Sequence, residues 1–334
     1  MADNHSTFLE FNDIIRLNST KKKQLRTSRK SVRDDISKYF KDNREKHSVS
    51  FKGQGSFPMD TTILPINNEY DVDDGVYIFG KSEDRPSVQT AHDWIYDAVK
   101  NRTDQETLDK KSCIRVQYAA QYHIDLPIYY KTEKGHESEI DEEIPLLAHK
   151  TNGWIESDPY KFVKWFDEQA NGKPQLKRII RYLKAWADHR SEKNKSLKFP
   201  NGLIFTILAC KHFSDNSRDD KSLLDTLKNI QSSIDDRFPF YGSYECYRPT
   251  IDTNEDLLNK FSAETVKNNF LDELKKIIES GNQAIEMESA KDSCSKWQKH
   301  LGDRFPCQNI TEDSEKLAKS FSVQEIFRHD NKSA

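Results

Sequence analysis

The sequence has few of the features that mark special classes of protein. Eleven glycines and eleven prolines among 334 residues exclude a collagen-like or low-complexity chain. No apolar run approaches the roughly 20 residues that span a bilayer. The first five residues lack the basic-then-apolar order of a signal peptide. We therefore expect a cytoplasmic protein with no membrane partner.

Cysteine is scarce as well. The five cysteines are widely spaced, and none belongs to a C-x-x-C pair, so the sequence indicates neither a zinc site nor a disulfide framework. We expect reduced thiols at all five positions, which are Cys113, Cys210, Cys246, Cys294 and Cys307.

Neither sign of charge dominates. The 52 Lys and Arg side chains are balanced by 55 Asp and Glu side chains, which leaves a net charge of −3. Such a balance argues against a protein that coats nucleic acid along its whole surface. Charged residues make up 32% of the chain and aromatic residues 11%. These proportions indicate a folded protein with an aromatic core and a very polar surface.

The order of the predicted elements indicates an α+β protein. Apolar residues at spacings of three and four predict helices over 20–40, capped by Thr20, and over 84–102. We expect domains at 1–155 and 156–322, followed by a flexible tail at 323–334. Strands are predicted over 48–51, 71–79, 114–119 and 122–130, with an acidic loop over 133–143. Later helices are predicted from Pro159 and over 175–189, 203–213, 223–234, 256–261, 263–279 and 289–301.

The predicted helix over 20–40 carries a basic cluster. Its apolar stripe consists of Leu25, Val32, Ile36 and Phe40, and cations occupy its other faces. The cluster is either a solvated helix face, which we favour, or a groove for phosphates or nucleic acid. Activation by nucleic acid is therefore not favoured. The cations are Lys21, Lys22, Lys23, Arg26, Arg29, Lys30 and Arg33.

Two carboxylates lie two residues apart on the predicted strand 71–79. Because side chains alternate along a strand, Asp71 and Asp73 project to one face and Val72 to the other. Carboxylates on one face repel each other unless a cation lies between them, and such oxygen ligands suit Mg²⁺ with substrate phosphates. Upstream, Gly55 lets the backbone approach a phosphate closely, and Ser56 adds a hydroxyl donor. The segment therefore predicts a site for Mg²⁺ and phosphate.

A third acid follows on the predicted strand 122–130. Asp125 stands among apolar residues, where a carboxylate is costly unless it is paired or bound to a metal. Each signal alone has an ordinary explanation, since an acidic turn accounts for the first pair and a capping role accounts for Asp125. Together, three carboxylates and a phosphate loop are the parts needed for two-metal nucleotidyl transfer.

The order of these motifs resembles a known family. The sequences QGSF at 54–57 and DVDDGVY at 71–77 are similar to the signature of the cGAS/DncV-like nucleotidyltransferases (CD-NTases), which belong to the polymerase-β superfamily. The sequence IDLP at 124–127 matches the third metal-binding acid of that family. The likeness extends from about residue 50 to residue 307. Members of the family include the bacterial cyclic oligonucleotide synthases of CBASS anti-phage defence.

The resemblance implies a fold and a set of site residues. The implied fold is a polymerase-β-like nucleotidyltransferase palm, a mixed sheet with helices, joined to a mostly helical C-terminal lobe. Asp71, Asp73 and Asp125 are implied as the catalytic residues and as the ligands of two Mg²⁺ ions, with Mn²⁺ able to substitute. The implied nucleotide-binding residues are Gln54, Gly55, Ser56, Lys184 and Asn201, the last in place of a serine that many members carry.

The resemblance also implies an activity. It is the joining of NTPs, with ATP and GTP as expected substrates, into a cyclic di- or trinucleotide second messenger, with release of pyrophosphate. One alternative is a linear nucleotidyltransferase that adds NMP to RNA ends or to a protein hydroxyl. Another is a nucleotide- or RNA-binding regulator with a degenerate site, against which the three intact acids argue.

The C-terminal residue suggests one further partner. In some members of the resembled family, this residue is joined to other proteins by an accessory ubiquitin-transfer-like enzyme. The small side chain of Ala334 would fit the narrow channel of such an enzyme. We favour the simpler interpretation of a frayed tail, because an ending in Ser-Ala is a weak signal.

Overall fold

The computed structural model describes residues 1–119, 122–132, 143–235, 246–251, 256–258 and 264–310. Contacts group the chain into two compact units. The sheet unit comprises 17–171 and 248–254, and the helical unit comprises 1–16, 172–247 and the residues from 255 onward. The expected tail and nearly all of the expected acidic loop lie outside the described residues, as does half of the expected helix over 256–261.

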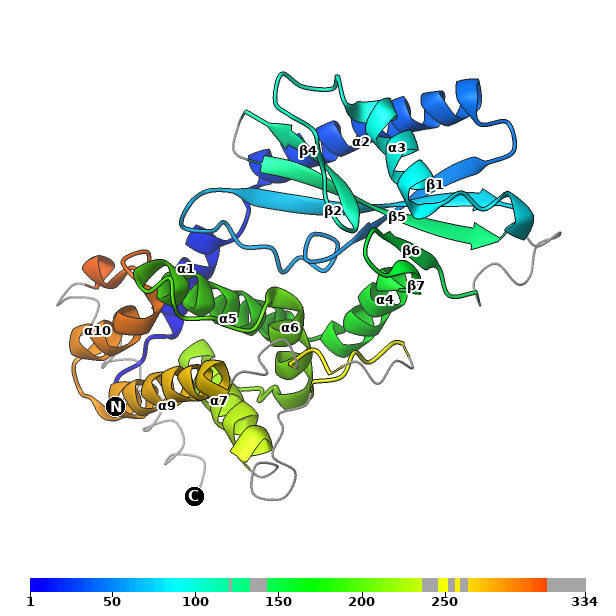
Figure 1. Cartoon of the computed structure of the whole chain (residues 1–334). Coiled ribbons are helices and arrows are strands. Elements are labelled where there is room, and N and C mark those ends of the chain that lie inside the picture. Colours follow the sequence, from blue (N-terminus) through cyan, green and yellow to red (C-terminus); the bar gives the residue numbers. More distant parts are fainter. Residues whose placement is uncertain (120–121, 133–142, 236–245, 252–255, 259–263, 311–334) are drawn as a thin grey trace, which may run out of the picture. The chain divides into compact units, whose positions relative to one another are not determined.

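The described part of the sheet unit contains a seven-stranded mixed sheet (Figure 1). Strands β2 and β5 pair in parallel, and all other neighbouring strands pair antiparallel. The strand order is β1-β2-β5-β4-β3, and β6 connects β5 with β7. The mixed sheet expected from the sequence is confirmed, whereas β3, β6 and β7 were not expected. The strands are β1 (Ser48–Gln54), β2 (Tyr70–Gly80), β3 (Leu108–Asp109), β4 (Cys113–Tyr118), β5 (Tyr122–Thr132), β6 (Leu146–His149) and β7 (Gly153–Glu156).

Helices α2 (Ser19–Asn43) and α3 (Val88–Val99) cover one face of this sheet (Figure 1). Alternate residues of the central strands, such as Val72 and Ile124, are buried against them. The apolar stripe predicted for α2 is fully buried in the same cluster. The predicted cap of α2 is wrong, because the side chain of Asn18, not Thr20, accepts the hydrogen bond from the Lys21 backbone N–H.

A buried ion pair ties α2 to the sheet. Asp74 belongs to β2, points to the same face as Val72, and is completely buried. Arg33 of α2 donates two hydrogen bonds to its carboxylate, the Nε–Oδ2 bond being 2.6 Å long. One member of the basic cluster therefore neutralises a charge that the core could not otherwise accommodate.

Aromatic side chains hold the helical unit together. Phe8 of α1 lies edge-on to Tyr182, Trp297 and Phe305, with ring centroids 5.1, 5.2 and 4.8 Å away. All four rings are buried, so α1 is an integral part of this core. The described helices of the unit are α1 (His5–Ile15), α5 (Pro174–Lys193), α6 (Gly202–His212), α7 (Asp219–Asp235), α9 (Glu264–Glu286) and α10 (Ala290–Leu301).

These contacts divide the described residues differently from the expected boundary at 155, and the expected boundary at 322 lies outside the described residues. Residues 1–16 join the helical unit through Phe8, although we expected them in the first domain. Helix α4 (Pro159–Ala170), expected in the helical lobe, belongs to the sheet unit and packs against β1. Pro159 occupies the first turn of α4, as predicted, and the side chain of Asp158 caps the helix.

The expectation of five reduced cysteines is wrong for two of them. Cys294 of α10 and Cys307 form a disulfide. The chain folds back after α10 and brings their Cα atoms within 5.7 Å, a proximity that a separation of 13 residues does not reveal. Cys113, Cys210 and Cys246 are free thiols.

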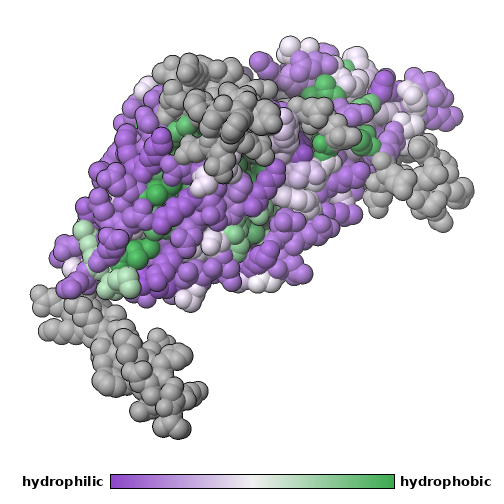
Figure 2. Space-filling view, turned by 90° about the horizontal axis from the view of Figure 1, so that it is seen from below, coloured by the Kyte–Doolittle hydropathy of each residue, from purple (hydrophilic) through white to green (hydrophobic). Residues whose placement is uncertain are grey.

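The surface is strongly polar. The face in Figure 2 is mostly hydrophilic, with hydrophobic residues confined to small patches. Among the described residues, only Met1, Leu9, Ile14 and Tyr247 are large hydrophobic residues with exposed side chains. None of the described helices combines the length and the apolar character needed to cross a membrane.

The buried ion pair gives a prediction about stability. We expect Arg33→Met to lower the free energy of unfolding by about 3 kcal/mol, because it leaves the Asp74 carboxylate buried without its counter-ion. The control is Lys30→Met, which removes an exposed pair with Asp34 on the same helix and should change stability by less than about 0.5 kcal/mol. Urea unfolding of both variants measures the difference. Equal effects would show that the pair with Asp74 contributes no more than an exposed pair.

Candidate active site

The pairing of β2 with β5 places the predicted acids on one face. Their parallel register sets Asp71 opposite His123 and Asp73 opposite Asp125. Because side chains alternate along both strands, these four residues project from the face opposite to the one that α2 and α3 cover. The sequence predicted the shared face of Asp71 and Asp73, and the register adds Asp125 and His123 to it.

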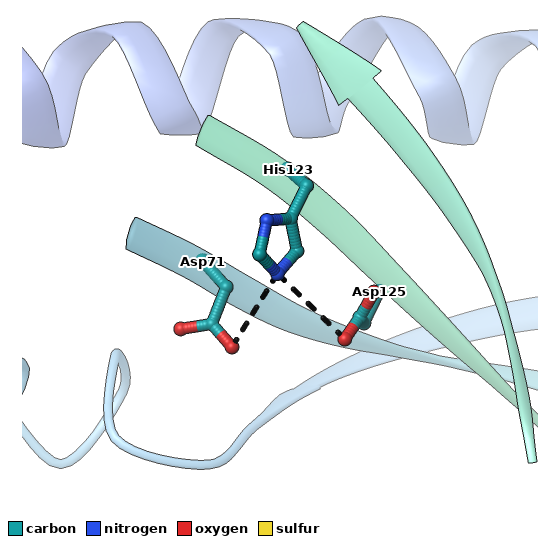
Figure 3. A group of neighbouring side chains, drawn as sticks. All are labelled: Asp71, His123 and Asp125. Carbon is teal, nitrogen blue, oxygen red and sulfur yellow. Dashed lines mark ion pairs between the residues drawn. The ribbon is translucent and has the colours of Figure 1, made fainter. Parts of the chain in front are cut away.

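Three of these side chains form a compact group (Figure 3). Candidate ligand atoms of Asp71, His123 and Asp125 all lie within 4.8 Å of one another. The Nε2 atom of His123 lies 3.8 Å from Oδ2 of Asp71 and 4.0 Å from Oδ2 of Asp125. Burial raises the pKa of Asp71, although the nearby His123 acts to lower it. Burial likewise lowers the pKa of His123, although the nearby Asp125 and Asp71 act to raise it. Carboxylates held this close fit a divalent cation.

Asp73 lies beside this group and against the phosphate loop. Burial, followed by repulsion from Asp71 and Asp125, raises the pKa of Asp73 to about 8. A Cβ atom on Gly55 would come within 2.3 Å of Oδ2 of Asp73. Gly55 also has a φ of +68°, a conformation that favours glycine. The glycine therefore lets the loop backbone approach a carboxylate that is poorly compensated without a cation.

Asp125 has a counter-ion that the sequence analysis missed. Arg115 stands directly opposite Asp125 in the antiparallel pairing of β4 with β5. Its Nε and a terminal nitrogen each donate a hydrogen bond of 2.7 Å to the Asp125 carboxylate. This bidentate pair explains how an acid survives in an apolar strand, and it fixes the direction of the carboxylate. Only the register between two strands reveals this partner.

The other residues of the predicted phosphate loop lie next to the acids. Gln54 stands opposite Asp73 in the pairing of β1 with β2, and its Oε1 packs over Gly75, with no hydrogen-bond partner in the described part of the chain. The hydroxyls of Ser56 and Thr62 are 2.8 Å apart and hydrogen-bonded. Gln54, Gly55 and Ser56 thus adjoin the acids from the edge of the sheet.

Lys184 and Asn201 belong to the helical unit. Asn201 caps α6, and its side chain accepts a hydrogen bond from the Ile204 backbone N–H over 3.0 Å. The side chain of Lys184 lies beside Gly202, the residue after Asn201. A Cβ atom on Gly202 would lie 3.0 Å from Cε of Lys184. The structure therefore brings these two predicted phosphate contacts together, and their role stays a prediction.

The basic cluster of α2 contacts aromatic residues and acids of its own unit. The guanidinium carbons of Arg26 and Arg29 lie 6.0 and 5.7 Å from the ring centroid of Phe57, which follows the phosphate loop. The ammonium of Lys21 lies 4.7 Å from the ring of Tyr70. Lys22 pairs with Asp60 and Arg33 with Asp74. These contacts give much of the cluster a structural role.

Comparison with known proteins identifies the segment that holds the acids. Residues 49–129 match the family model described as "Cyclic GMP-AMP synthase DncV-like, nucleotidyltransferase domain". Over this segment, about a quarter of the chain, the protein is similar to the DncV-like nucleotidyltransferase domain. The match begins in β1 and ends in β5, so it contains the phosphate loop and all three acids.

Two curated proteins share sequence with this chain. A cyclic GMP-AMP synthase of Escherichia albertii is 28% identical over 199 residues, which are 56% of this chain and 42% of that protein. A c-di-GMP synthase of Roseivirga ehrenbergii is 22% identical over 237 residues, which are 61% of this chain and 60% of that protein. The alignments thus span less than two thirds of either relative.

Solved structures of the same fold cover most of the chain. The Vibrio cholerae DncV cyclic AMP-GMP synthase, in complex with nonhydrolyzable GTP, superposes with a TM-score of 0.75 at 17% identity, over 91% of this chain and 97% of that one. The Escherichia coli CdnC:HORMA-deltaN complex gives a TM-score of 0.70 at 15% identity, over 90% of this chain and 98% of that one. The polymerase-β-like nucleotidyltransferase fold expected from the sequence is therefore confirmed.

The raised pKa of Asp73 leads to a prediction for Asp73→Asn. In the folded protein the pKa of Asp73 is about 8, whereas the ordinary value is 3.8. The folded state therefore holds this proton more tightly than the unfolded state, and the protein loses stability as the pH rises from 3.8 towards 8. In EDTA at pH 8, we expect the variant to melt about 2–4 °C above the wild type, with a smaller gain at pH 5. The exposed acid Asp104 provides the control, and Asp104→Asn should leave the melting temperature unchanged at both pH values. A variant less stable than the wild type at pH 8 would contradict the prediction.

The contact between Gly55 and Asp73 can be tested with a matched pair of glycines. Gly55→Ala and Gly153→Ala both place a side chain at positive φ, which costs about 1 kcal/mol in each case. Only the first brings a Cβ against Asp73, because no atom of the described residues lies within 4 Å of a Cβ at Gly153. We expect Gly55→Ala to reduce NTP turnover at least about tenfold by displacing the carboxylate, whereas Gly153→Ala stays near the wild type. Equal turnover in both variants would contradict this.

Proposed function

We propose that the protein is a cyclic oligonucleotide synthase. It joins NTPs, ATP and GTP above all, into a cyclic di- or trinucleotide and releases pyrophosphate. The product would act as a second messenger in anti-phage defence, as the CBASS resemblance implies. The observation that carries the proposal is the placement of Asp71, Asp73 and Asp125 on one face of a DncV-like domain, beside the phosphate loop.

The three acids would bind the metal ions of the proposed reaction. Two Mg²⁺ ions, with Mn²⁺ as a substitute, would activate the attacking ribose hydroxyl and stabilise charge on the transferred phosphate. Asp71, Asp73 and Asp125 would hold these ions, which suits carboxylates that repel one another without a cation. Arg115 keeps the Asp125 carboxylate in one orientation and so acts as a positioning residue.

The remaining predicted residues would bind the donor triphosphate. Gly55 allows close approach of the backbone, Ser56 contributes a hydroxyl, and Gln54 contributes an amide at the edge of the acidic face. The family resemblance implies Lys184 and Asn201 as further phosphate-binding residues, and a lysine ammonium offsets phosphate charge. The same residues would serve the first transfer and the second transfer, which closes the ring.

A cyclic product is favoured over the linear alternative by the relatives. The two curated proteins are a cyclic GMP-AMP synthase and a c-di-GMP synthase. A linear transferase would need only one acceptor and one transfer step, and neither name describes such an enzyme. A purely regulatory role has less support still, because all three acids are intact and share one face.

Partners and location follow from the same proposal. NTPs are the proposed substrates, and solved DncV structures contain nonhydrolyzable GTP. One structural relative, CdnC, is in a complex with HORMA-deltaN, which makes a protein partner of that kind an open candidate here. Conjugation through Ala334 concerns a residue outside the described part of the chain and stays a prediction. We keep activation by nucleic acid as disfavoured and the cytoplasm as the expected location.

Incubation of the purified protein with radiolabelled NTPs and Mg²⁺ tests the activity. We expect a small labelled product that alkaline phosphatase does not degrade, because a cyclic oligonucleotide has no terminal phosphate. Mass spectrometry then gives its bases and ring size. Asp71→Asn is the control and should keep no more than a few per cent of the turnover. Labelled chains that phosphatase trims would indicate the linear alternative, and the absence of turnover would favour a regulator.

A further inference from the structure

His123 is the member of the Asp71–His123–Asp125 group that the proposed function leaves without a role. It lies on β5 two residues before Asp125 and opposite Asp71, so its ring enters the acidic face (Figure 3). Its side chain is only 7% exposed, and its buried Nε2 has no hydrogen-bond partner among the described residues. A buried polar atom without a partner requires an explanation. Here that atom points between two carboxylates, where a cation would satisfy all three groups.

The other ring nitrogen of His123 faces a different acid. Nδ1 lies 3.5 Å from Oε1 of Glu69, a half-exposed residue just before β2. A histidine that binds a metal usually directs its second ring nitrogen to a carboxylate or carbonyl, which selects the tautomer that leaves the lone pair toward the metal. Glu69 is placed to select the tautomer with the proton on Nδ1. The Nε2 lone pair then faces Asp71 and Asp125.

The spacing of the group suits a single ion. Ligands at about 2.1 Å in an octahedral arrangement are about 3 Å apart when adjacent and about 4.2 Å apart when opposite. The distances from Nε2 to the two carboxylate oxygens, 3.8 and 4.0 Å, fall between these values. The hydrogen bonds from Arg115 hold the Asp125 carboxylate but leave each of its oxygens a further lone pair.

We infer that Nε2 of His123 is a metal ligand together with Asp71 and Asp125. The nitrogen makes this site favour divalent transition-metal ions, represented by Mn²⁺, over Mg²⁺. Imidazole is a common ligand for transition metals, whereas Mg²⁺ is bound almost entirely through oxygen. The inference uses the site of the proposed function but concerns metal binding, which can be measured without any nucleotide.

Pulsed EPR of the full chain loaded with Mn²⁺ alone tests the inference directly. We expect electron spin-echo modulation from a directly bound ¹⁴N nucleus, and its replacement by a ¹⁵N signal when histidine is labelled with ¹⁵N. This labelling needs no variant, so the test is valid even if substitutions at His123 fail to fold. Wild-type protein that binds no Mn²⁺, or that binds it without nitrogen coupling, overturns the inference.

A matched pair of variants assigns the nitrogen. His123→Gln should lose the nitrogen coupling and weaken Mn²⁺ binding at least about tenfold, while Mg²⁺ binding falls less than about threefold. The control is His149→Gln, on the β6–β7 hairpin of the same unit, which should keep both properties. Coupling that survives in His123→Gln, or equal losses for both ions, overturns the inference. If the coupling is assigned to His123 and no cyclic product forms from NTPs, the proposed function fails and the ligand assignment stands.

Discussion

The parallel pairing of β2 with β5 is the constraint on which the candidate site depends. It sets four side chains in two facing rows and places three carboxylates where they repel one another. The opposite face of the same two strands holds the acids in position, because Val72 and Ile124 on that face are buried under α2 and α3. Any outward shift of the acids would expose this apolar surface to water. The core therefore holds an electrostatically unfavourable arrangement in place, and this is the general way in which a binding site is preorganised.

Arginine side chains make the arrangement tolerable on both faces of the sheet. Arg33 neutralises Asp74 on the core face, and Arg115 neutralises Asp125 on the acidic face. No described arginine pairs with Asp71 or Asp73 in this way, and burial, followed for Asp73 by repulsion from the other acids, raises the pKa of both carboxyls. The sheet thus separates acids that serve the fold from acids that remain available to a cation. Neighbouring residues 73 and 74 differ in this respect only because strand alternation sends them to opposite faces.

Much of this could be predicted from the sequence, and the limits have physical causes. Alternation within one strand is a local property, so the shared face of Asp71 and Asp73 could be predicted before any pairing was known. Arg115 and His123 could not be assigned, since their neighbours are set by the register between strands, which a single sequence does not specify. A clue was present, because His123-x-Asp125 repeats the two-residue spacing of Asp71-x-Asp73. The strands β6 and β7 were missed because they are only four residues long.

The packing of α1 has a consequence for how the protein is made. Residues 17–171 form the main body of the sheet unit from one continuous stretch, which can assemble soon after it leaves the ribosome. Phe8, in contrast, packs against Trp297 and Phe305, which lie about 290 residues later in the sequence. The apolar side of α1 therefore stays without these partners until that later segment has been translated. During that interval its apolar side chains are open to the nonspecific contacts that chaperones prevent.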